Sequence, residues 1–194
     1  MKLYYAPGAC SLSPHIALLE AGLPYDLVKV DLRAKKLENG DDFLKINPKG
    51  QVPALALDSG ELITEGPVIV QVIADQAADK NLAPSRDHAD RYKLQAWLTY
   101  INSELHKNLG PQFAPALSDD AKAFFKDRVM GKFKYVDSEL AGKDYLMGTR
   151  KFVELCHRLE AKYGSRFTPP KLLEDMAAKG ETFYGKFPPK KQAA

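Results

Sequence analysis

The 194-residue chain has little cysteine and no long apolar run. Its two cysteines, Cys10 and Cys156, exclude a disulfide framework and a cysteine-rich metal site. No apolar stretch approaches the roughly 20 residues that a membrane span requires, and no glycine-rich phosphate loop occurs. The four histidines show no metal-ligand spacing, so we expect no metal site. The residues that are present, 45% hydrophobic and 27% charged, are typical of a globular protein.

The net charge of +3 is unevenly distributed along the chain. Residues 1–148 hold 18 Lys and Arg against 20 Asp and Glu, whereas residues 149–194 hold 10 against 5. A basic tail suits either an adaptor for nucleic acid or the solvated faces of amphipathic helices. The second interpretation is favoured because the basic residues are spread around helical patterns, so we expect no nucleic-acid partner. Pro7 and Gly8 stand where a signal peptide would be apolar, which predicts a cytoplasmic protein without a membrane partner.

Hydrophobic periodicity predicts a small α/β unit in the first part of the chain. Its elements are expected, in chain order, as a strand at 2–5, a helix at 11–21, strands at 25–30, 52–57 and 61–64, and a helix at 67–76. The first three elements form a βαβ unit with parallel pairing. Asp58-Ser59-Gly60 closes the next two strands into a hairpin. The unit therefore has four predicted strands.

The rest of the chain is predicted to be helical. Residues 77–87 are polar and suit a linker, and a long helical pattern begins at His88. A second helix is expected at 119–139, with an apolar face of Phe124, Phe125, Met130, Phe133 and Val136. The tail offers two further amphipathic helices, at 149–163 and 169–179.

Cys10 is the sharpest chemical signal in the sequence. It lies between the first strand and the first helix, where the helix dipole and unpaired N–H groups are expected to lower the pKa of the thiol. The adjacent Ser11 hydroxyl would then cap the helix or donate to a bound thiolate. The alternative is that Cys10 is a small apolar filler beside a helix cap, and its position alone leaves both interpretations open.

Two further segments are expected at the same edge of the sheet. The proline of Gln51-Val52-Pro53 favours a cis bond, which would leave the backbone of Val52 open to an extended peptide. Glu65 and Gly66 open the helix at 67–76, where N–H groups suit a carboxylate and Glu65 suits an ammonium group. Each segment alone is more often a simple turn, and His106 alone is more often structural. Together with Cys10 they indicate a ligand site.

These motifs resemble the cytosolic beta-class glutathione transferases of bacteria. The resemblance covers residues 1–148. It depends on segments at 4–15 (Tyr-Tyr-x-Pro-Gly-Ala-Cys-Ser-Leu-Ser-Pro-His), 47–55 (Asn-Pro-Lys-Gly-Gln-Val-Pro-Ala-Leu), 64–66, 74–76, 97–98 and 104–107 (Glu-Leu-His-Lys). It implies an α/β thioredoxin-like N-terminal domain and an all-α C-terminal domain that is truncated or atypical after residue 148. It also implies a homodimer that takes glutathione as co-substrate, without a cofactor.

The resemblance also implies roles for individual residues. Cys10 would lie near the glutathione sulfur and form a mixed disulfide, while Ser11 and His106 would polarise the thiol. The glutathione-binding residues would be Lys35, Gln51, Val52, Pro53, Glu65, Gly66, Glu104 and Lys107. Of these, Val52 would pair with the cysteinyl part, Glu65 and Gly66 would take the γ-glutamyl end, and Lys35 the glycyl carboxylate. Glu104 would act across the dimer interface.

The chain departs from the family pattern at two places. Thr99 stands where the family usually has an asparagine that contacts glutathione, and no Ser/Thr-x-Ala-Asp box follows Gly148. Residues 152–184 resemble instead the C-terminal end of the fatty-acid oxidation multifunctional enzymes with 3-hydroxyacyl-CoA dehydrogenase activity. We therefore divide the chain into a glutathione-binding domain at 1–80, a helical domain at 88–148 and an atypical helical tail at 149–194.

The predicted function is a glutathione transferase that conjugates the glutathione thiol to a small electrophile. Free thiols are mostly protonated at pH 7, so a site that stabilises the thiolate increases the amount of nucleophile. Thiol–disulfide exchange through Cys10 is a predicted second activity. The alternative is a protein that binds glutathione or a hydrophobic ligand with little turnover, because the replaced C-terminal helices would supply much of the wall for the second substrate.

Overall fold

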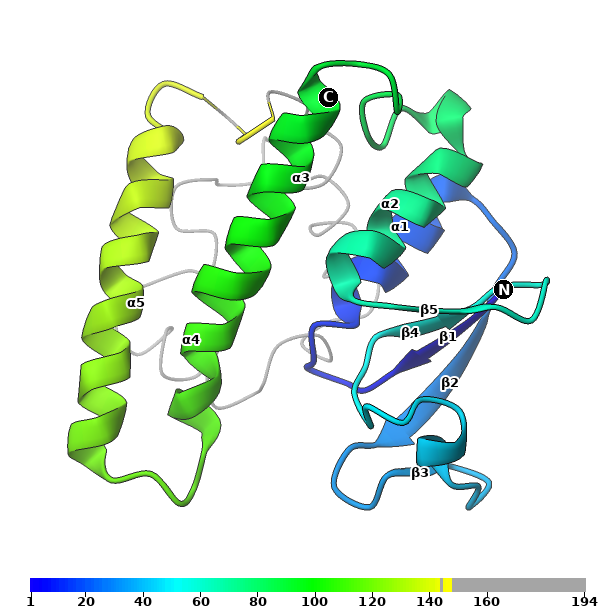
Figure 1. Ribbon diagram of the computed structural model, residues 1–194, viewed down its shortest axis with the longest axis horizontal. Coiled ribbons are helices and arrows are strands. Elements are labelled where there is room, and N and C mark those ends of the chain that lie inside the picture. Colours follow the sequence, from blue (N-terminus) through cyan, green and yellow to red (C-terminus); the bar gives the residue numbers. More distant parts are fainter. Residues whose placement is uncertain (144, 148–194) are drawn as a thin grey trace, which may run out of the picture.

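A computed structural model describes residues 1–143 and 145–147. In this part of the chain a sheet with two helices comes first, and a pair of long helical segments follows it (Figure 1). None of the helices in these ranges is both long and apolar enough to cross a membrane. The predicted helices of the tail, and its resemblance over 152–184, lie outside the described residues.

The sheet has the strand order β3-β2-β1-β4-β5. The strands are β1 (Lys2–Tyr5), β2 (Asp26–Asp31), β3 (Lys36–Leu37), β4 (Ala54–Ala56) and β5 (Leu62–Thr64). β1 pairs in parallel with β2 through Leu3 opposite Leu27, and antiparallel with β4 through Leu3 opposite Leu55. β4 and β5 form the predicted hairpin. The mixed sheet confirms the thioredoxin-like fold that the resemblance implies.

The prediction of four strands is wrong by one edge strand. β3 adds to β2 by pairing Leu37 with Val30 and Lys36 with Asp31. Sequence periodicity misses it because a two-residue strand is too short to show an alternation of polar and apolar residues. The chain then turns through a 3₁₀ helix, Phe43–Lys45, capped by the Asp42 side chain.

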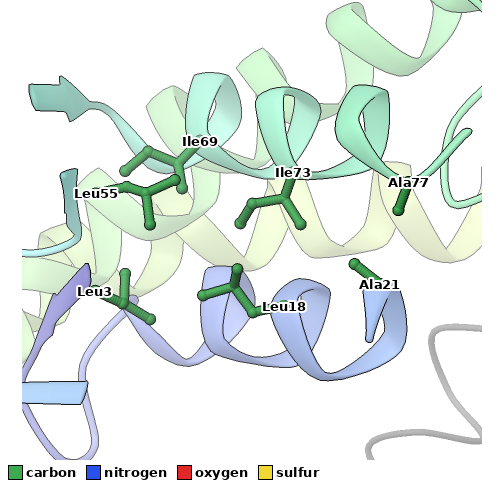
Figure 2. Close-up of a cluster of buried hydrophobic side chains, with 7 residues drawn as sticks. All are labelled: Leu3, Leu18, Ala21, Leu55, Ile69, Ile73 and Ala77. Atoms are coloured by element: carbon green, nitrogen blue, oxygen red, sulfur yellow. The ribbon is translucent and has the colours of Figure 1, made fainter. Parts of the chain in front are cut away.

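Two helices cover one face of the sheet. They are α1 (Leu12–Ala21), which ends at Gly22 in the left-handed conformation, and α2 (Gly66–Gln76). Figure 2 shows the cluster between them, in which Ile69, Ile73 and Ala77 face Leu18 and Ala21, with Leu3 and Leu55 of the sheet at one end. Burying each large apolar side chain contributes about 1.5–3 kcal/mol, so this cluster fixes both helices on the sheet.

The opposite face of the sheet has its own core. Side chains alternate between the faces of a strand, so Tyr4 points away from the cluster that holds Leu3. Tyr4 packs there against the fully buried Phe43, at a ring-centroid distance of 5.6 Å. Because Phe43 belongs to the 3₁₀ helix, this contact anchors the segment that leads into Asn47–Pro53.

The helical region begins with a nearly continuous helix. α3 (Asp90–Tyr100) continues through a π-helical stretch (Ile101–His106) into α4 (Lys107–Leu109) and a 3₁₀ turn (Gly110–Phe113). α5 (Asp119–Glu139) runs beside it, as Figure 1 shows, and is capped by Ser118. The prediction of two helices is confirmed, but the π-helical stretch has no sequence signal that we recognised.

The predicted apolar face of α5 is only partly correct. Val129 is the buried residue of this helix, whereas Phe124, Met130 and Phe133 are exposed. The prediction gave most weight to the largest apolar side chains. The side chain of α5 that is buried belongs to Val129, which is smaller.

A buried arginine joins the two regions. Arg91 of α3 donates from Nη1 to Oδ1 of Asp75 at 2.9 Å and from Nη2 to Oδ2 at 3.1 Å. It also donates to the Pro84 carbonyl at 2.9 Å and to Oε1 of Gln71 at 3.1 Å. Several bonds from one guanidinium hold α2, α3 and the connection between them in a fixed relation.

Candidate active site

The loop after β1 presents Cys10 at the start of α1. Gly8 adopts a positive φ of 70°, and the N–H of Ala9 donates to the Ala6 carbonyl at 3.2 Å, so the chain turns sharply before the helix. Cys10 is exposed, and its thiol donates to the carbonyl oxygen of Val52 at 3.4 Å. The nucleophile that the sequence predicts therefore lies against the segment that it predicts to bind a peptide.

The prediction that the pKa of Cys10 is lowered is wrong for the free protein. Desolvation of the thiolate by the surrounding protein raises the pKa of the Cys10 thiol, and the negative charge of Glu65 acts in the same direction. A backbone hydrogen bond at Cys10 and the positive charge of Lys107 lower it, but they do not compensate for the desolvation. The helix dipole alone does not make Cys10 a thiolate.

Ser11 is placed differently from the prediction. Its hydroxyl is buried, donates to the Ala6 carbonyl and accepts from the Ala6 N–H, both at 3.2 Å. It makes no helix-capping bond, and the residue does not line the cleft described below. Ser11 therefore closes the loop that carries Cys10 and does not point toward a ligand thiol.

The segment Asn47–Pro53 is held by a buried side chain. Asn47 donates from Nδ2 to the Gln51 carbonyl at 2.8 Å and accepts at Oδ1 from the N–H of Lys49 at 3.2 Å. Gly50 has a positive φ of 59°, and a Cβ there would lie 2.9 Å from the Leu44 side chain. The Val52–Pro53 peptide bond is cis, as predicted. The backbone of Val52 thus belongs to a loop whose shape is fixed by the hydrogen bonds of the Asn47 side chain.

Lys35 contacts this segment, and Lys49 belongs to it. Nζ of Lys35 donates to the Gly50 carbonyl at 2.8 Å. Nζ of Lys49 donates to Oε1 of Glu65 at 2.9 Å and to Oγ1 of Thr64 at 3.0 Å. Glu65 precedes α2 with a positive φ of 68°, so its side chain stands at the N-terminal end of that helix. This end of a helix favours negative ligand groups.

The helical region supplies the other wall of the site. Its contributors are Asn102, His106, Lys107 and Phe113, from the π-helical stretch, α4 and the following 3₁₀ turn. The carbonyl of Asn102 accepts from the N–H of Lys107, the bond to the fifth residue on that defines a π turn. Phe113 is 76% exposed. An exposed aromatic ring at the edge of a cleft suits an apolar ligand.

These segments enclose a cleft of about 500 Å³. It brings together nine of the predicted residues: Cys10, Lys35, Gln51, Val52, Pro53, Glu65, Gly66, His106 and Lys107. It also includes residues that the sequence did not single out, among them Lys49, Asn102 and Phe113. Loops and a helix far apart in the sequence converge here, which no single motif reveals.

Glu104 lies outside this cleft. Its carboxylate accepts a hydrogen bond from Lys132 of α5, and this bond lowers the pKa of Glu104. The predicted role of Glu104 in the site is therefore not supported within one copy of the chain. In this copy the residue joins the π-helical stretch to α5.

A larger cleft, of about 610 Å³, lies between α3 and α5. Its wall includes Trp97, Tyr100 and Tyr135, and the rings of Trp97 and Tyr135 stack with centroids 5.9 Å apart. These aromatic side chains pack on one another, and within residues 1–143 and 145–147 neither a cysteine nor a histidine lines this cleft. We therefore assign the chemistry to the smaller cleft that contains Cys10.

Comparison with known proteins identifies the family. Residues 8–76 match the glutathione S-transferase N-terminal domain. The chain is also 47% identical over 150 residues to the glutathione S-transferase GstA of Escherichia coli O157:H7, which covers 77% of this chain and 75% of that relative. The chain belongs to the glutathione S-transferase family.

Two solved structures extend this result to the fold of the transferase. A sphingomonad glutathione S-transferase complexed with glutathione is 40% identical, with a TM-score of 0.76 over 94% of this chain and 100% of the other. A beta-class glutathione S-transferase of Sphingomonas chungbukensis is also 40% identical, with a TM-score of 0.75 and the same coverage. The transferase is therefore of the bacterial beta class.

The departure at position 99 has a structural counterpart in this transferase. Thr99 is exposed and does not line the cleft, whereas Asn102, one turn further along, does. An asparagine therefore lines the cleft at position 102 and not at position 99.

Proposed function

We propose that the cleft binds reduced glutathione and that the transferase conjugates its thiol to small electrophiles. One observation supports this most directly: Cys10, Val52 and Glu65 line the same cleft. A thiol tripeptide with a free amino acid end needs a backbone partner for its middle residue, a charged partner for each end and a polar site for its sulfur. The cleft offers all of these.

In this proposal the backbone of Val52 pairs with the cysteinyl part of glutathione. Glu65 binds the ammonium group, and the N–H of Gly66 faces the γ-glutamyl end, while Lys35 binds the glycyl carboxylate. Gln51 and Pro53 shape the loop on either side of Val52. The sulfur then lies near Cys10, with His106 and Lys107 on the opposite wall. Ser11 and Glu104 are left out because their side chains are bonded elsewhere.

The conjugation follows from the charges around the sulfur. The positive charge of Lys107 stabilises a thiolate, and His106 accepts the thiol proton or passes it to water. The thiolate attacks an electrophilic carbon, a C–S bond forms, and the leaving group departs with its electron pair. The acceptor lies against Phe113. Glutathione is the co-substrate, and the proposed reaction needs no cofactor.

Cys10 gives the cleft a second proposed reaction. Once deprotonated, it attacks a sulfur of glutathione disulfide, forms a mixed disulfide and releases one glutathione thiolate.

Because both reactions consume or release reduced glutathione, we place the transferase in the reducing cytoplasm. We also retain the division into domains at 1–80 and 88–148 and a tail at 149–194 as part of this proposal.

We propose further that the transferase is a homodimer. Large apolar side chains remain exposed on α2, α3 and α5, among them Val68, Tyr92 and Phe124. Exposed apolar side chains of this size favour association with another protein surface. Light scattering after size-exclusion chromatography tests this proposal, because a monomeric mass at micromolar concentration would contradict it.

The experiment that tests the proposed function is conjugation of glutathione to 1-chloro-2,4-dinitrobenzene. We expect turnover by the wild type, and a Lys107→Met variant with kcat/KM lowered about fivefold to tenfold, since a nearby charge of this kind shifts a thiol pKa by up to about one unit. Lys126→Met, an exposed lysine of α5 outside the cleft, is the matched control. Retention on immobilised glutathione without any turnover would favour the alternative, a binding protein.

A further inference from the structure

Lys49 is a charged residue of the cleft to which neither the sequence motifs nor the proposed reaction assigns a role. Its Nζ lies 2.9 Å from Oε1 of Glu65, and both side chains are about half exposed. The two opposite charges therefore lie side by side on the wall of the cleft, with solvent on one side. The Thr64 hydroxyl, 3.0 Å from the same nitrogen, fixes the direction of the lysine side chain.

The backbone of Lys49 is fixed by the protein interior. Its N–H donates to Oδ1 of the buried Asn47, and the N–H of the next residue, Gly50, donates to the Asn47 carbonyl at 2.8 Å. Since Glu65 and Thr64 also hold its Nζ, the side chain loses less freedom when the ammonium group binds a ligand. Lys49 is thus better prepared for binding than an ordinary surface lysine.

The other two lysines of the cleft have different partners. Nζ of Lys35 is bonded to the Gly50 carbonyl, and the charge of Lys107 acts on Cys10. Lys49 is bonded to Glu65, the residue that we assign to the ammonium group of glutathione. It is therefore the lysine placed to act on the amino acid end of the ligand.

An α-amino acid end carries an ammonium group and a carboxylate on one carbon atom. The Lys49–Glu65 pair carries the same two charges on neighbouring side chains. When such an end lies against the pair, its ammonium group contacts Glu65 and its carboxylate contacts Lys49, so that each of the four charges has an opposite neighbour. Hydrogen bonds between charged groups are stronger than neutral ones. When the ligand lacks the carboxylate, Lys49 stays bound to Glu65. It then competes with the ammonium group of the ligand for the Glu65 carboxylate.

We propose that Lys49 binds the α-carboxylate at the γ-glutamyl end of glutathione, beside the ammonium group that Glu65 binds. This inference rests on the proposed function, because it names a further contact to the same ligand. It makes Lys49 the residue that selects thiol peptides with a free α-amino acid end over peptides that carry only an amine.

The test compares two peptides that differ in this one group. The two peptides are glutathione and 4-aminobutyryl-cysteinyl-glycine, which lacks only the α-carboxylate. Each is titrated by isothermal calorimetry, in the presence of a phosphine reductant, into the full-length wild type, Lys49→Met and Lys45→Met. Lys45 is an exposed lysine at the end of the preceding 3₁₀ helix and lies outside the cleft, so its variant controls for the loss of one positive charge.

We expect the wild type and Lys45→Met to bind glutathione about tenfold more tightly than the other peptide, the effect of one charged hydrogen bond. Lys49→Met should bind both peptides with similar Kd values, and binding of the decarboxylated peptide shows that this variant is folded. A tenfold preference that persists in Lys49→Met would overturn the inference. An equal loss of affinity for both peptides would also overturn it, because it would mean that Lys49 acts only through Glu65. A wild type that binds neither peptide would overturn the proposed function as well.

Discussion

The thiol of Cys10 donates a hydrogen bond to the carbonyl oxygen of Val52 across 3.4 Å in the free protein. This bond needs a protonated sulfur, and the raised pKa of Cys10 keeps it protonated. In the proposed complex the same carbonyl is the partner of the glutathione backbone. We therefore expect the ligand backbone to compete with the Cys10 thiol for this carbonyl.

The first prediction concerns the reactivity of Cys10 in the free protein. Because the pKa of its thiol is raised, we expect alkylation by iodoacetamide at pH 7 to be slower than that of free cysteine, with a pH profile shifted to alkaline values. Lys107→Met removes a stabilising positive charge and should slow alkylation further, whereas Glu65→Gln removes a negative charge and should accelerate it. Rates are measured by mass spectrometry in a Cys156→Ser background. A Glu65→Gln variant that reacts more slowly than its parent would contradict the assigned charges.

The second prediction concerns the mixed disulfide. On incubation with glutathione disulfide, we expect one glutathionyl group on the peptide that contains Cys10, and its loss in Cys10→Ala. Cys156→Ala is the matched control and should retain the adduct. Peptide mapping by mass spectrometry distinguishes the two positions. If the Cys10 peptide stays unmodified in the wild type while conjugation proceeds, Cys10 has only a binding role.

The third prediction concerns Asn47, the buried residue whose side chain stabilises the segment Asn47–Pro53 that carries Val52. Asn47→Ala removes the bond to the Gln51 carbonyl and leaves that acceptor without its partner, so we expect the free energy of unfolding to fall by about 1–3 kcal/mol. Urea denaturation measures this loss. Because the loop carries Val52, KM for glutathione should also rise severalfold while kcat changes less. Asn39→Ala, whose side chain bonds the exposed Asp41, is the control. An unchanged KM would show that the loop keeps its shape without Asn47.

The sequence predicts the parts of this site that lie within one motif. Cys10, Val52 and Glu65 each follow or precede a regular element, and the ends of such elements can be located from hydrophobic periodicity. The same reasoning predicts α5 at the residues where it is observed. Periodicity works best for α1 and α2, because each buries several apolar residues on one face against the sheet.

Orientation could not be predicted in this way. Ser11 is adjacent to Cys10 in the sequence, yet its hydroxyl is buried on Ala6 because successive residues at a helix start point in different directions. Lys49 enters the cleft because its loop lies against Thr64 and Glu65 at the start of α2, 15 and 16 residues further along the chain. Phe113 enters it from the helical region. A lysine in a loop and a phenylalanine after a helix have no local pattern that distinguishes them from ordinary surface residues.

The fourth prediction concerns the electrophile. Phe113 is exposed at the edge of the cleft, so an aromatic acceptor can cover it. Phe113→Ala should raise KM for 1-chloro-2,4-dinitrobenzene about fivefold, which corresponds to about 1 kcal/mol of lost apolar contact. KM for glutathione and the thermal midpoint should change little, because few packing contacts are lost. Phe133→Ala, an exposed phenylalanine of α5 outside the cleft, is the control. Equal effects of the two substitutions would place the acceptor elsewhere.

The fifth prediction concerns acid stability. Burial raises the pKa of Asp75, but the hydrogen bonds from Arg86 and Arg91 outweigh it, so the pKa lies below the ordinary aspartate value. A carboxyl group with a lower pKa in the folded state stabilises the fold above its unfolded pKa, and this stabilisation is lost as the pH falls below about 4. Asp75→Asn should therefore be less stable than the wild type at pH 7, and the difference should shrink toward pH 3.

The matched control for this effect is Asp79→Asn, an exposed carboxylate after α2. Arg91→Ala tests the same contact from the other side. It leaves Asp75 without its buried partner, and we expect a loss of about 3 kcal/mol at pH 7. Chemical denaturation across pH measures all three variants.

Since Arg91 is bonded to α2 and to the connection at Pro84, its loss should also loosen the helical wall of the cleft. KM for glutathione should then rise in Arg91→Ala, although Arg91 contacts no part of the proposed ligand. An Arg91→Ala variant with wild-type stability and KM would show that the position of the helical wall depends on other contacts.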